Sequence, residues 1–399
     1  MPWTLRMISY AGILLLLLLI YFGYRYFKSI KILNLRPHWL YRILYFVPAG
    51  LFLAYPLAGH IQYWTQGSFS RTGYPDVVVY LYWYGVVCMG VMLNWLLLHD
   101  LLRPLVIRVS NTNAQKLNRR FAKVFLIIAG FTVIYTGGKM ILDTSRIVVD
   151  EIAYTLPQNV RSAETFLPSG PLTVVHIADL HADKYTGEKK MNRYIQKVNE
   201  ANPDIVIFAG DLISSGLDYI EAGADALADI KSTHGTFFVM GDHDYWSGTD
   251  EIAEALEERG IRVLQNENVL VRHDESLIKI TGVTELYSYQ IDSLLLHDLL
   301  NEEAGEDLHL IASHQASHRL IREAVDSGVH QLLAGHTHGG QIRVPLSFYP
   351  ITAARAESSY VKGSWQIGEM LLNINSGLGF TLAPVRYNAP AQVTVINVQ

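Results

Sequence analysis

Four long apolar runs in the first part of the chain constrain its fold more than any other feature. They cover about residues 7–26, 40–57, 76–98 and 124–142. A helix that crosses a bilayer needs about 20 consecutive, mostly apolar residues. We therefore predict a transmembrane region of about four helices over residues 1–145 and an integral, multi-pass membrane protein.

The first run, residues 7–26, contains six consecutive leucines and could instead be a signal peptide. No small-residue cleavage site follows it, and it leaves through Tyr24-Arg25-Tyr26-Phe27-Lys28, a boundary typical of a retained span. We therefore interpret it as an anchor. The second run is the weakest of the four, because Arg42 lies in its first turn and Pro48 and Pro56 interrupt it.

Charge divides the chain at about the same place. Residues 1–149 hold 15 Lys/Arg and three acids, a net charge of +12, whereas the rest holds 17 Lys/Arg and 34 acids, a net charge of −17. The two sum to the −5 of the whole chain. The second part is therefore an acidic soluble domain, long enough for one substantial core. Its acidity argues against binding nucleic acid, and the single cysteine, Cys88, excludes an internal disulfide.

Short connections rich in Lys and Arg stay on the cytoplasmic side of a membrane. The second connection, residues 58–75, holds only Arg71, whereas the other two connections are strongly basic. Their cations are Arg25, Lys28, Lys31, Arg36 and Arg42 around the first, and Arg103, Arg108, Lys116, Arg119, Arg120 and Lys123 in the third. With four spans, the soluble domain is then expected on the extracytoplasmic side of a plasma or inner membrane.

Residues 146–170 connect the two parts. Residues 146–156 alternate enough to be an entry strand, and residues 157–170 form a polar link punctuated by Pro and Gly. The soluble domain is then residues 171–399.

Within this domain, several buried strands each end in residues that can hold a metal. The strand 172–178 is followed by Asp179 and His181, and in extended backbone residues two apart point to the same side, so both can reach one cation. The other strand ends carry Asp211, then Asp242 and His243, then His314, and finally His336 and His338 between glycines.

Any one of these residues could be a helix cap or a solvated histidine, but five strand ends with such residues indicate one site. Nitrogen and oxygen donors without cysteine suit manganese, iron or zinc, and their number exceeds what one ion needs. Two divalent metal ions are therefore expected.

The ordered motifs DLH, GDL, GDHD, SH and GHTHGG resemble the calcineurin-like metallophosphoesterases from about Val174 to the carboxy terminus. GHTHGGQI and the later SGLG followed by PVR make the membrane-anchored branch of that superfamily the most similar. The resemblance implies a multi-span helical anchor followed by an α/β domain of two packed mixed β-sheets flanked by helices. It also implies that Asp179, His181 and His338 hold one metal ion, that Asp211 bridges, that Asp242, His314 and His336 hold the other ion, and that His243 is an unligated catalytic group.

The chemistry that this resemblance implies is hydrolysis of a phosphate ester by a hydroxide shared between two ions about 3.5–4 Å apart. His243 would then bind the phosphoryl oxygen or protonate the leaving group. The alternative for His243 is electrostatic support of the phosphate alone.

Three positions need separate comment. Asp242 stands where the family usually has asparagine, and the extra carboxylate is expected to tighten cation binding while weakening attraction for an anionic substrate. His318 is a rival to His314, but a helix beginning near Ala316 would turn it away from the site, so we prefer His314. Arg386 could contact a substrate phosphate or form a structural ion pair.

We therefore predict a membrane-anchored, metal-dependent phosphoesterase, with monoesters and diesters both open. A phospholipid or a lipid-linked nucleotide is a candidate substrate, and the bilayer, not nucleic acid, is the expected partner. The alternative is a metal-retaining but catalytically weak phosphoester sensor, of which Asp242 would be the mark. Oligomeric state and metal identity do not follow from the sequence.

The predicted orientation can be tested by single cysteines at Ser162 and Thr112, after removal of Cys88. In intact cells an impermeant thiol reagent should label Ser162→Cys and spare Thr112→Cys, because the third connection is expected in the cytoplasm. Labelling of Thr112→Cys alone would reverse the orientation.

Overall fold

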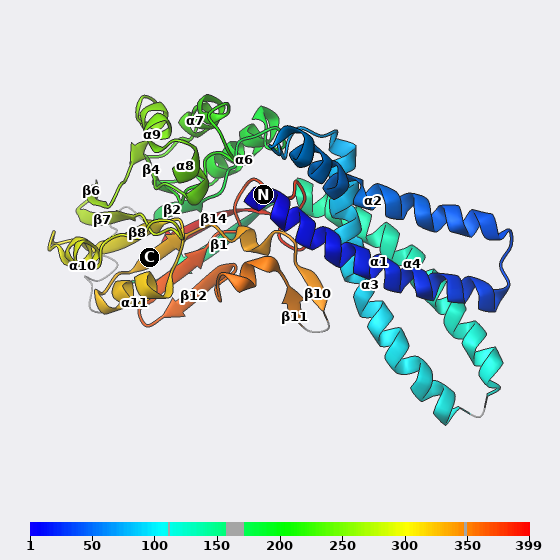
Figure 1. The fold of residues 1–399 in the computed structure, drawn as a ribbon. Coiled ribbons are helices and arrows are strands. Elements are labelled where there is room, and N and C mark those ends of the chain that lie inside the picture. Colours follow the sequence, from blue (N-terminus) through cyan, green and yellow to red (C-terminus); the bar gives the residue numbers. More distant parts are fainter. Residues whose placement is uncertain (111, 157–170, 347–348) are drawn as a thin grey trace. The chain divides into compact units, whose positions relative to one another are not determined.

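The computed structural model describes residues 1–399 except 111, 157–170 and 347–348, and it divides into two compact units (Figure 1). The first unit comprises Met1–Thr144 with two short segments, Ile342–Thr352 and Leu382–Asn388. The second comprises Ser145–Gln341, Ala353–Thr381 and Ala389–Gln399. The predicted polar link 157–170, with Ser162, lies outside the described residues.

The first unit is built on four helices, each long and apolar enough to cross a membrane. They are α1 (Trp3–Leu33), α2 (His38–Gln66), α3 (Asp76–Val109) and α4 (Ala114–Ser145). Each is longer than the apolar run that predicted it. Helix α2 continues through Pro48 and Pro56, because neighbouring helices and local adjustments of the backbone can satisfy the groups that proline frees in a membrane segment.

Close helix packing in this unit uses glycine and tyrosine. The side chain of Phe52 in α2 lies against Gly85 in α3, where a Cβ atom would come within 2.7 Å of its ring. The hydroxyl of Tyr82 donates to the carbonyl of Ile8 at 2.5 Å, and that of Tyr45 donates to the carbonyl of Leu19 at 2.7 Å. These bonds join α3 and α2 to α1.

The two short segments of the first unit come from late in the chain, which the sequence did not predict. Ile342–Thr352 forms a hairpin of β10 (Val344–Leu346) and β11 (Tyr349–Ile351), and the side-chain amide of Asn94 in α3 donates to the carbonyl of Pro345. In Leu382–Asn388, the amide of Asn388 donates to Asp143 at 2.7 Å.

The second unit contains two six-stranded mixed sheets. The first has the order β1-β14-β2-β3-β4-β5, with β14 antiparallel to β2 and the other neighbours parallel. Its strands are β1 (Ile147–Tyr154), β14 (Ala391–Val398), β2 (Leu172–Ile177), β3 (Ile205–Phe208), β4 (Thr236–Phe238) and β5 (Arg262–Val263).

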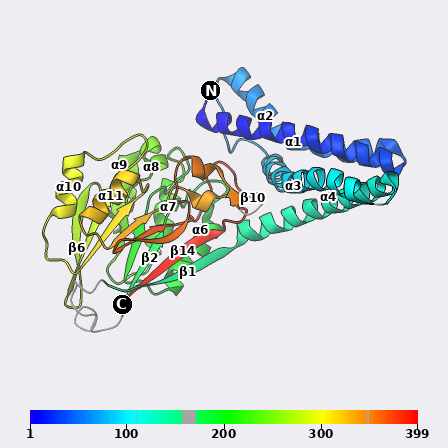
Figure 2. The same ribbon diagram turned by 90° about the horizontal axis from the view of Figure 1, so that it is seen from below.

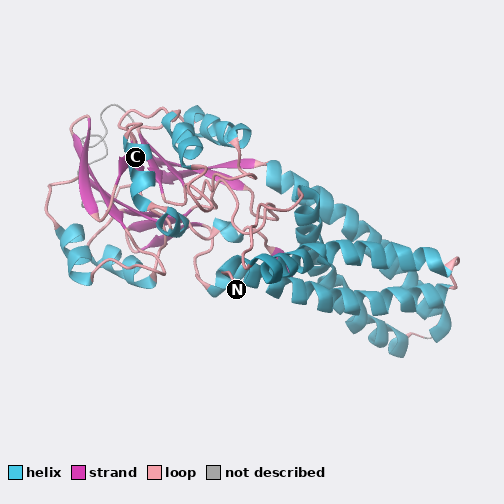
Figure 3. Ribbon diagram, turned by 45° about the horizontal axis from the view of Figure 1, so that its top comes forward, coloured by secondary structure: helices cyan, strands magenta, loops and turns pink. Residues whose placement is uncertain are grey.

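The second sheet has the order β12-β13-β9-β8-β7-β6, with antiparallel pairs only at its two edges. Its strands are β12 (Gly363–Ile367), β13 (Met370–Ile374), β9 (Gln331–Ala334), β8 (Leu308–Ser313), β7 (Ser276–Val283) and β6 (Glu267–His273). The helices of this unit are α6 (Glu188–Glu200), α7 (Ile220–Ala228), α8 (Asp242–Ser247), α9 (Thr249–Glu257), α10 (Ser293–Asn301), α11 (His318–Asp326), η1 (His338–Gly340) and η2 (Ala353–Ala356) (Figure 3).

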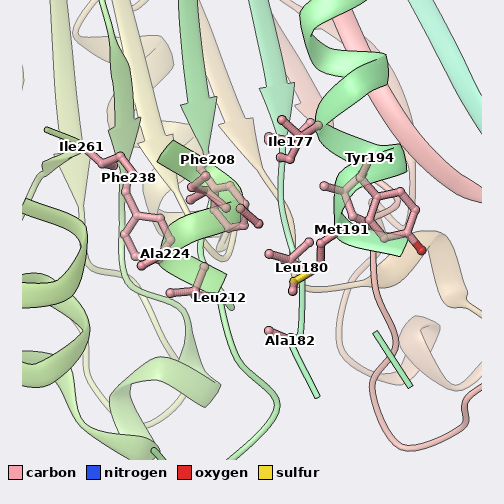
Figure 4. Close-up of a cluster of buried hydrophobic side chains, with 14 of the residues drawn as sticks. Ile177, Leu180, Ala182, Met191, Tyr194, Phe208, Leu212, Ala224, Phe238 and Ile261 are labelled. Atoms are coloured by element: carbon pink, nitrogen blue, oxygen red, sulfur yellow. The ribbon is translucent and has the colours of Figure 1, made fainter. Parts of the chain in front are cut away.

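Successive side chains of a strand point to opposite faces of its sheet, and the buried apolar ones form three layers. In β2, Val175 faces the layer beneath α6, α7 and α9, whereas Val174 faces the layer between the sheets. Figure 4 shows part of the first layer, where Phe208 and Phe238 stack with ring centroids 5.1 Å apart. A third layer lies between the second sheet and α10 and α11. The order helix, sheet, sheet, helix confirms the predicted fold class.

Parallel strands from both sheets direct their carboxy ends toward one region. Strands β2, β3 and β4 run parallel in the first sheet, and β8 and β9 run parallel in the second. These are the five strands whose ends carry the candidate ligands, so the topology brings residues far apart in sequence together.

Candidate metal centre

The seven candidate ligands follow the ends of five strands. Asp179 and His181 follow β2, Asp211 follows β3, Asp242 is the first residue of α8 after β4, His314 follows β8, and His336 and His338 follow β9. Six of these side chains are buried, and only His336 keeps partial exposure. They form two groups, in each of which one donor atom per residue lies within 4.8 Å of the others.

The first group is Asp179, His181, Asp211 and His338. The Nε2 atoms of His181 and His338 lie 3.0 Å apart. His181 Nε2 is 3.2 Å from Asp211 Oδ2, and His338 Nε2 is 3.4 Å from Asp179 Oδ1. Four donors therefore converge on one small volume.

The second group is Asp242, His314 and His336. Asp242 Oδ1 lies 2.9 Å from His314 Nε2 and 3.1 Å from His336 Nδ1, and these two nitrogens are 3.3 Å apart. The histidines of the GHTH motif therefore belong to different groups. His318, the rival to His314, is instead the first residue of α11.

The carboxylate of Asp211 contacts both groups through one oxygen. Its Oδ2 atom lies 3.2 Å from His181 Nε2 and 3.4 Å from His314 Nε2. Its Oδ1 atom accepts a hydrogen bond from the backbone N–H of His243 at 2.9 Å. This side chain is therefore fixed between the two groups.

The backbone at the ligands differs from the sequence-based expectation. We expected extended backbone to bring Asp179 and His181 together, but both have left-handed conformations, with φ of 52° and 47°. The expectation was wrong because β2 ends at Ile177, before the ligands begin. Left-handed values also occur at Asp211 (62°), His336 (70°) and His338 (50°). Such conformations are rare for residues other than glycine and are concentrated at functional sites.

Two glycines allow the loops to pass close to the carboxylates. A Cβ atom on Gly241 would lie 2.1 Å from Asp211 Oδ1, and one on Gly335 would lie 2.7 Å from Asp179 Oδ2. Both distances are too short for a real Cβ atom. The two carboxylates therefore occupy space that a side chain at position 241 or 335 would need.

Asp244 positions the loop of Asp211, and sequence reasoning did not give it a role. Its carboxylate accepts hydrogen bonds from the backbone N–H groups of Asp211 and Leu212 at 2.8 Å and of Gly241 at 2.9 Å. Burial, followed by repulsion from Asp211, raises the pKa of Asp244 to about 8. The second aspartate of GDHD was the available signal.

The tautomer of His314 follows from its other ring nitrogen. Nδ1 lies 2.7 Å from the carbonyl oxygen of Ala209, which can only accept, so Nδ1 carries a proton. In the neutral ring, Nε2 then directs its lone pair toward Asp242 and Asp211. This arrangement is typical of an imidazole that binds a metal and is oriented by a backbone carbonyl.

Mutual attraction governs the charges of the cluster. Burial alone would raise the pKa of Asp211, but attraction from His314, His243 and His181 holds it well below its usual range. Burial alone would lower the pKa of His336, but hydrogen bonds to Asp242 and Glu357 raise it to about 9. The pKa of Asp179 rises to about 7, mainly through burial. Protons on the imidazoles balance the carboxylates here, and bound cations would displace them.

His243 lies beside the first group. Its Nδ1 atom is 2.5 Å from the carbonyl oxygen of Ser214, so Nδ1 donates and Nε2 is the available nitrogen. Its ring meets that of His181 edge-on, with centroids 4.7 Å apart. His243 thus stands next to the ligands without being a member of either group.

Exposed aromatic side chains surround the cluster. Trp246, 58% exposed, lies 5.3 Å from His243 between ring centroids, and Tyr287, 60% exposed, lies 5.3 Å from His336. Tyr245 and Tyr289 stack on each other with centroids 5.5 Å apart. We call Tyr245, Trp246, Tyr287 and Tyr289 the aromatic rim.

Arg386 is fully buried and belongs to the first unit. Its backbone N–H donates to the hydroxyl of Thr144 at 3.0 Å. A contact between its guanidinium and a substrate phosphate stays a prediction.

Comparison with known proteins gives the same family for this part of the chain. Residues 172–340 match the family model of the calcineurin-like phosphoesterases. An uncharacterized metallophosphoesterase of Campylobacter jejuni is 29% identical over 249 residues, which cover 60% of this chain and 63% of that protein. The phosphodiesterase YaeI of Escherichia coli is 28% identical over 233 residues, which cover 57% and 82%.

A transmembrane protein with a metallophosphoesterase domain from Danio rerio is 27% identical over 237 residues, which cover 56% of this chain and 52% of that protein. The chain thus spans about half to two-thirds of the length of the Campylobacter and Danio relatives. The matched region contains all seven candidate ligands and His243. Residues 172–340 of this chain therefore form a calcineurin-like metallophosphoesterase domain.

Proposed function

We propose that this chain is a membrane-anchored phosphoesterase that works with two divalent metal ions. The observation that carries the proposal is the position of Asp211, whose Oδ2 atom is within 3.4 Å of an imidazole from each group. A carboxylate so placed can serve two cations at once. Two separate single-ion sites would not need it.

The donors fit such a pair of ions. Three carboxylates and four imidazoles, without sulfur, suit manganese, iron or zinc. Asp179, His181 and His338 would hold one ion, Asp242, His314 and His336 the other, and Asp211 both. When bound, the ions would supply the Lewis acidity that activates water and neutralises phosphoryl charge.

His243 would act on the substrate through Nε2. Because Nδ1 is committed to the carbonyl of Ser214, Nε2 carries a proton only when the whole imidazole is protonated. Donation to a phosphoryl oxygen or to the departing alkoxide therefore requires the imidazolium. The carboxylate of Asp211 accepts a hydrogen bond from the backbone N–H of His243 and so helps to fix the position of this residue.

The aromatic rim supports an ester with a large organic group. All four aromatic side chains are at least 40% exposed, and two of them contact the site: Trp246 lies against His243 and Tyr287 against the ligand His336. Exposed aromatic rings lower solubility, so a group of them on a surface usually marks a binding site. Beside a phosphoester site, such rings could bind the lipid chain or the base of a substrate. A phospholipid and a lipid-linked nucleotide are the two substrates we propose.

The membrane anchor and the charge of its connections complete the proposal. The connection between α1 and α2 and that between α3 and α4 are the basic ones, so these ends of the helices would face the cytoplasm. The phosphoesterase domain would then work on the extracytoplasmic side.

Replacing Asp211 by asparagine tests the metal pair directly. Asp211→Asn removes the charge shared by the two groups, so full-length protein in detergent should lose at least one metal ion per chain, measured by elemental analysis. Turnover of model phosphodiesters and phosphomonoesters should fall by about 100-fold or more. The exposed Asp218, on the loop after the same strand, gives a matched control, Asp218→Asn, that should keep both metal and activity.

The same measurement separates the enzyme from the sensor. A sensor would bind metal and phosphate esters but show no metal-dependent turnover of either ester class in the unaltered chain. Turnover that is lost in Asp211→Asn and retained in Asp218→Asn would exclude it.

Asp242→Asn tests the extra carboxylate. The amide keeps an oxygen near His314 Nε2 and His336 Nδ1 but removes one negative charge, so cations should bind more weakly while turnover stays within about tenfold. Metal titrations with manganese, iron and zinc should reveal a changed order of preference. Complete loss of metal would mean that Asp242 has a role beyond donating one oxygen.

Trp246→Ala tests the aromatic rim. Loss of one aromatic contact should raise KM for a phospholipid in mixed micelles by about threefold to tenfold, while kcat for a small soluble diester stays unchanged. Leu294→Ala, which removes an exposed apolar side chain from α10, should change neither. Equal losses with both esters would place Trp246 in the catalytic machinery, against this assignment.

A further inference from the structure

A second cluster of charged side chains lies in the first unit, which we call the helical unit. Arg25 of α1 contacts two residues of α3: one of its terminal nitrogens is 2.7 Å from Asp100 Oδ1 and 2.6 Å from His99 Nδ1. The hydroxyl of Tyr21 donates to the other oxygen of Asp100 at 2.5 Å. Arg25 is buried, with 9% of its side chain exposed. Charged groups buried among membrane helices usually mark a functional site.

A small pocket opens beside this cluster. It is lined by Arg25, Lys28, Ser29 and Ile32 of α1, His99 and Arg103 of α3, and Asn118, Phe121 and Ala122 of α4. Its volume of about 10 Å³ holds roughly one water molecule. It can therefore take a small polar group at its mouth, but it cannot enclose a large ligand.

Three of the lining side chains are cations, and two of them have no acidic partner among the described residues. Arg103 donates through Nε and a terminal nitrogen to Asn118 Oδ1, at 3.0 and 2.7 Å, and Lys28 donates to the hydroxyl of Tyr24 at 3.2 Å. Both are partly buried. Asp100, the nearby carboxylate, is already engaged by Arg25 and Tyr21. The pocket therefore keeps an excess of positive charge.

Two buried nitrogens in the pocket also lack hydrogen-bond partners in the described part of the chain. They are Nε of Arg25 and Nε2 of His99. Nε of Arg25 can only donate, and a buried donor without an acceptor is unfavourable, so it favours a ligand with acceptor oxygens. Partly buried cations and this unpaired donor together select an anion.

The place of the pocket indicates where this anion comes from. The pocket lies toward the ends of the helices that carry the connections α1–α2 and α3–α4, and both connections are at the same end of the bundle (Figures 1 and 2). At this depth lipid headgroups meet the polar ends of membrane helices. Basic pockets between helices at this level suit the phosphate of an anionic lipid.

We propose that the pocket formed by Arg25, Lys28, His99 and Arg103 binds the phosphate of an anionic phospholipid. The phosphate lies at the mouth of the pocket, accepts hydrogen bonds from Lys28 and Arg103, and links α1, α3 and α4. This site is separate from the metal centre, because all its residues belong to the helical unit. It does not depend on the phosphoesterase activity.

Native mass spectrometry of the full-length protein in detergent, titrated with phosphatidylglycerol, tests the proposal. The double variant Lys28→Gln/Arg103→Gln removes the two cations without an acidic partner. Lys31→Gln/Arg108→Gln is the matched control, with the same charge change on the same two helices at exposed positions outside the pocket. Equal thermal midpoints of the two double variants would establish that both are folded.

The pocket variant should bind phosphatidylglycerol about 30-fold more weakly than the control, since each of the two cations near the headgroups contributes about 1 kcal/mol. Asp211→Asn should bind it as the unaltered chain does, and phosphatidylcholine should bind weakly to all. Equal weakening in the control would reduce the effect to general surface charge and overturn the site. Displacement of the lipid by an equal concentration of inorganic phosphate would assign the pocket to free phosphate and overturn the lipid assignment.

Discussion

The burial of three carboxylates against four imidazoles is the constraint on which the rest of the α/β unit depends. Asp179, Asp211 and Asp242 are each at most 4% exposed, and isolated charges so placed would cost several kcal/mol each. They persist because every one lies within 3.4 Å of at least one imidazole nitrogen. Asp211 lies near one imidazole from each group and therefore connects the groups. Any rearrangement of one loop thus changes the charge balance of both.

The sheets supply the rigidity that this balance requires. Five ligands have left-handed backbone, which costs about 1–3 kcal/mol at each residue and survives only when the surroundings fix it. The five strands that lead to these loops are almost wholly buried between apolar layers. Asp244 adds three hydrogen bonds to the backbone around Asp211. Strain at the ligands is therefore offset by packing beneath them.

The sequence predicted what depends on pattern and missed what depends on contacts between distant residues. Strands that lead to Asp179, Asp211 and His314 can be predicted from runs of apolar residues followed by polar ones. The left-handed backbone at Asp179 cannot be predicted in this way, because it occurs in a loop that packs against Gly335 and Gly377 from distant parts of the chain.

The same limit explains the other differences. The sequence gives Asp244 no visible role, because the amides of Asp211 and Leu212 that it binds are brought to it only by the fold. The association of residues 342–352 and 382–388 with the helices likewise depends on contacts between residues far apart in the sequence, such as Asn388 with Asp143. The sequence alone does not show that Trp246 and Tyr287 are exposed, because aromatic residues occur both in cores and at binding surfaces.

Asp242 gives the two groups of ligands the same number of carboxylates. If Asp211 is counted with both groups, each group has two carboxylates and two imidazoles, because Asp242 and Asp211 in the second group match Asp179 and Asp211 in the first. An asparagine at this position would leave the second group with one carboxylate and unequal charge. With the two divalent cations that we propose, three carboxylates would leave one positive charge, whereas two carboxylates would leave two. The proposed site would then combine equal donor sets with a weaker attraction for anions, which would suit the proposed substrate, held mainly through its organic part at the aromatic rim.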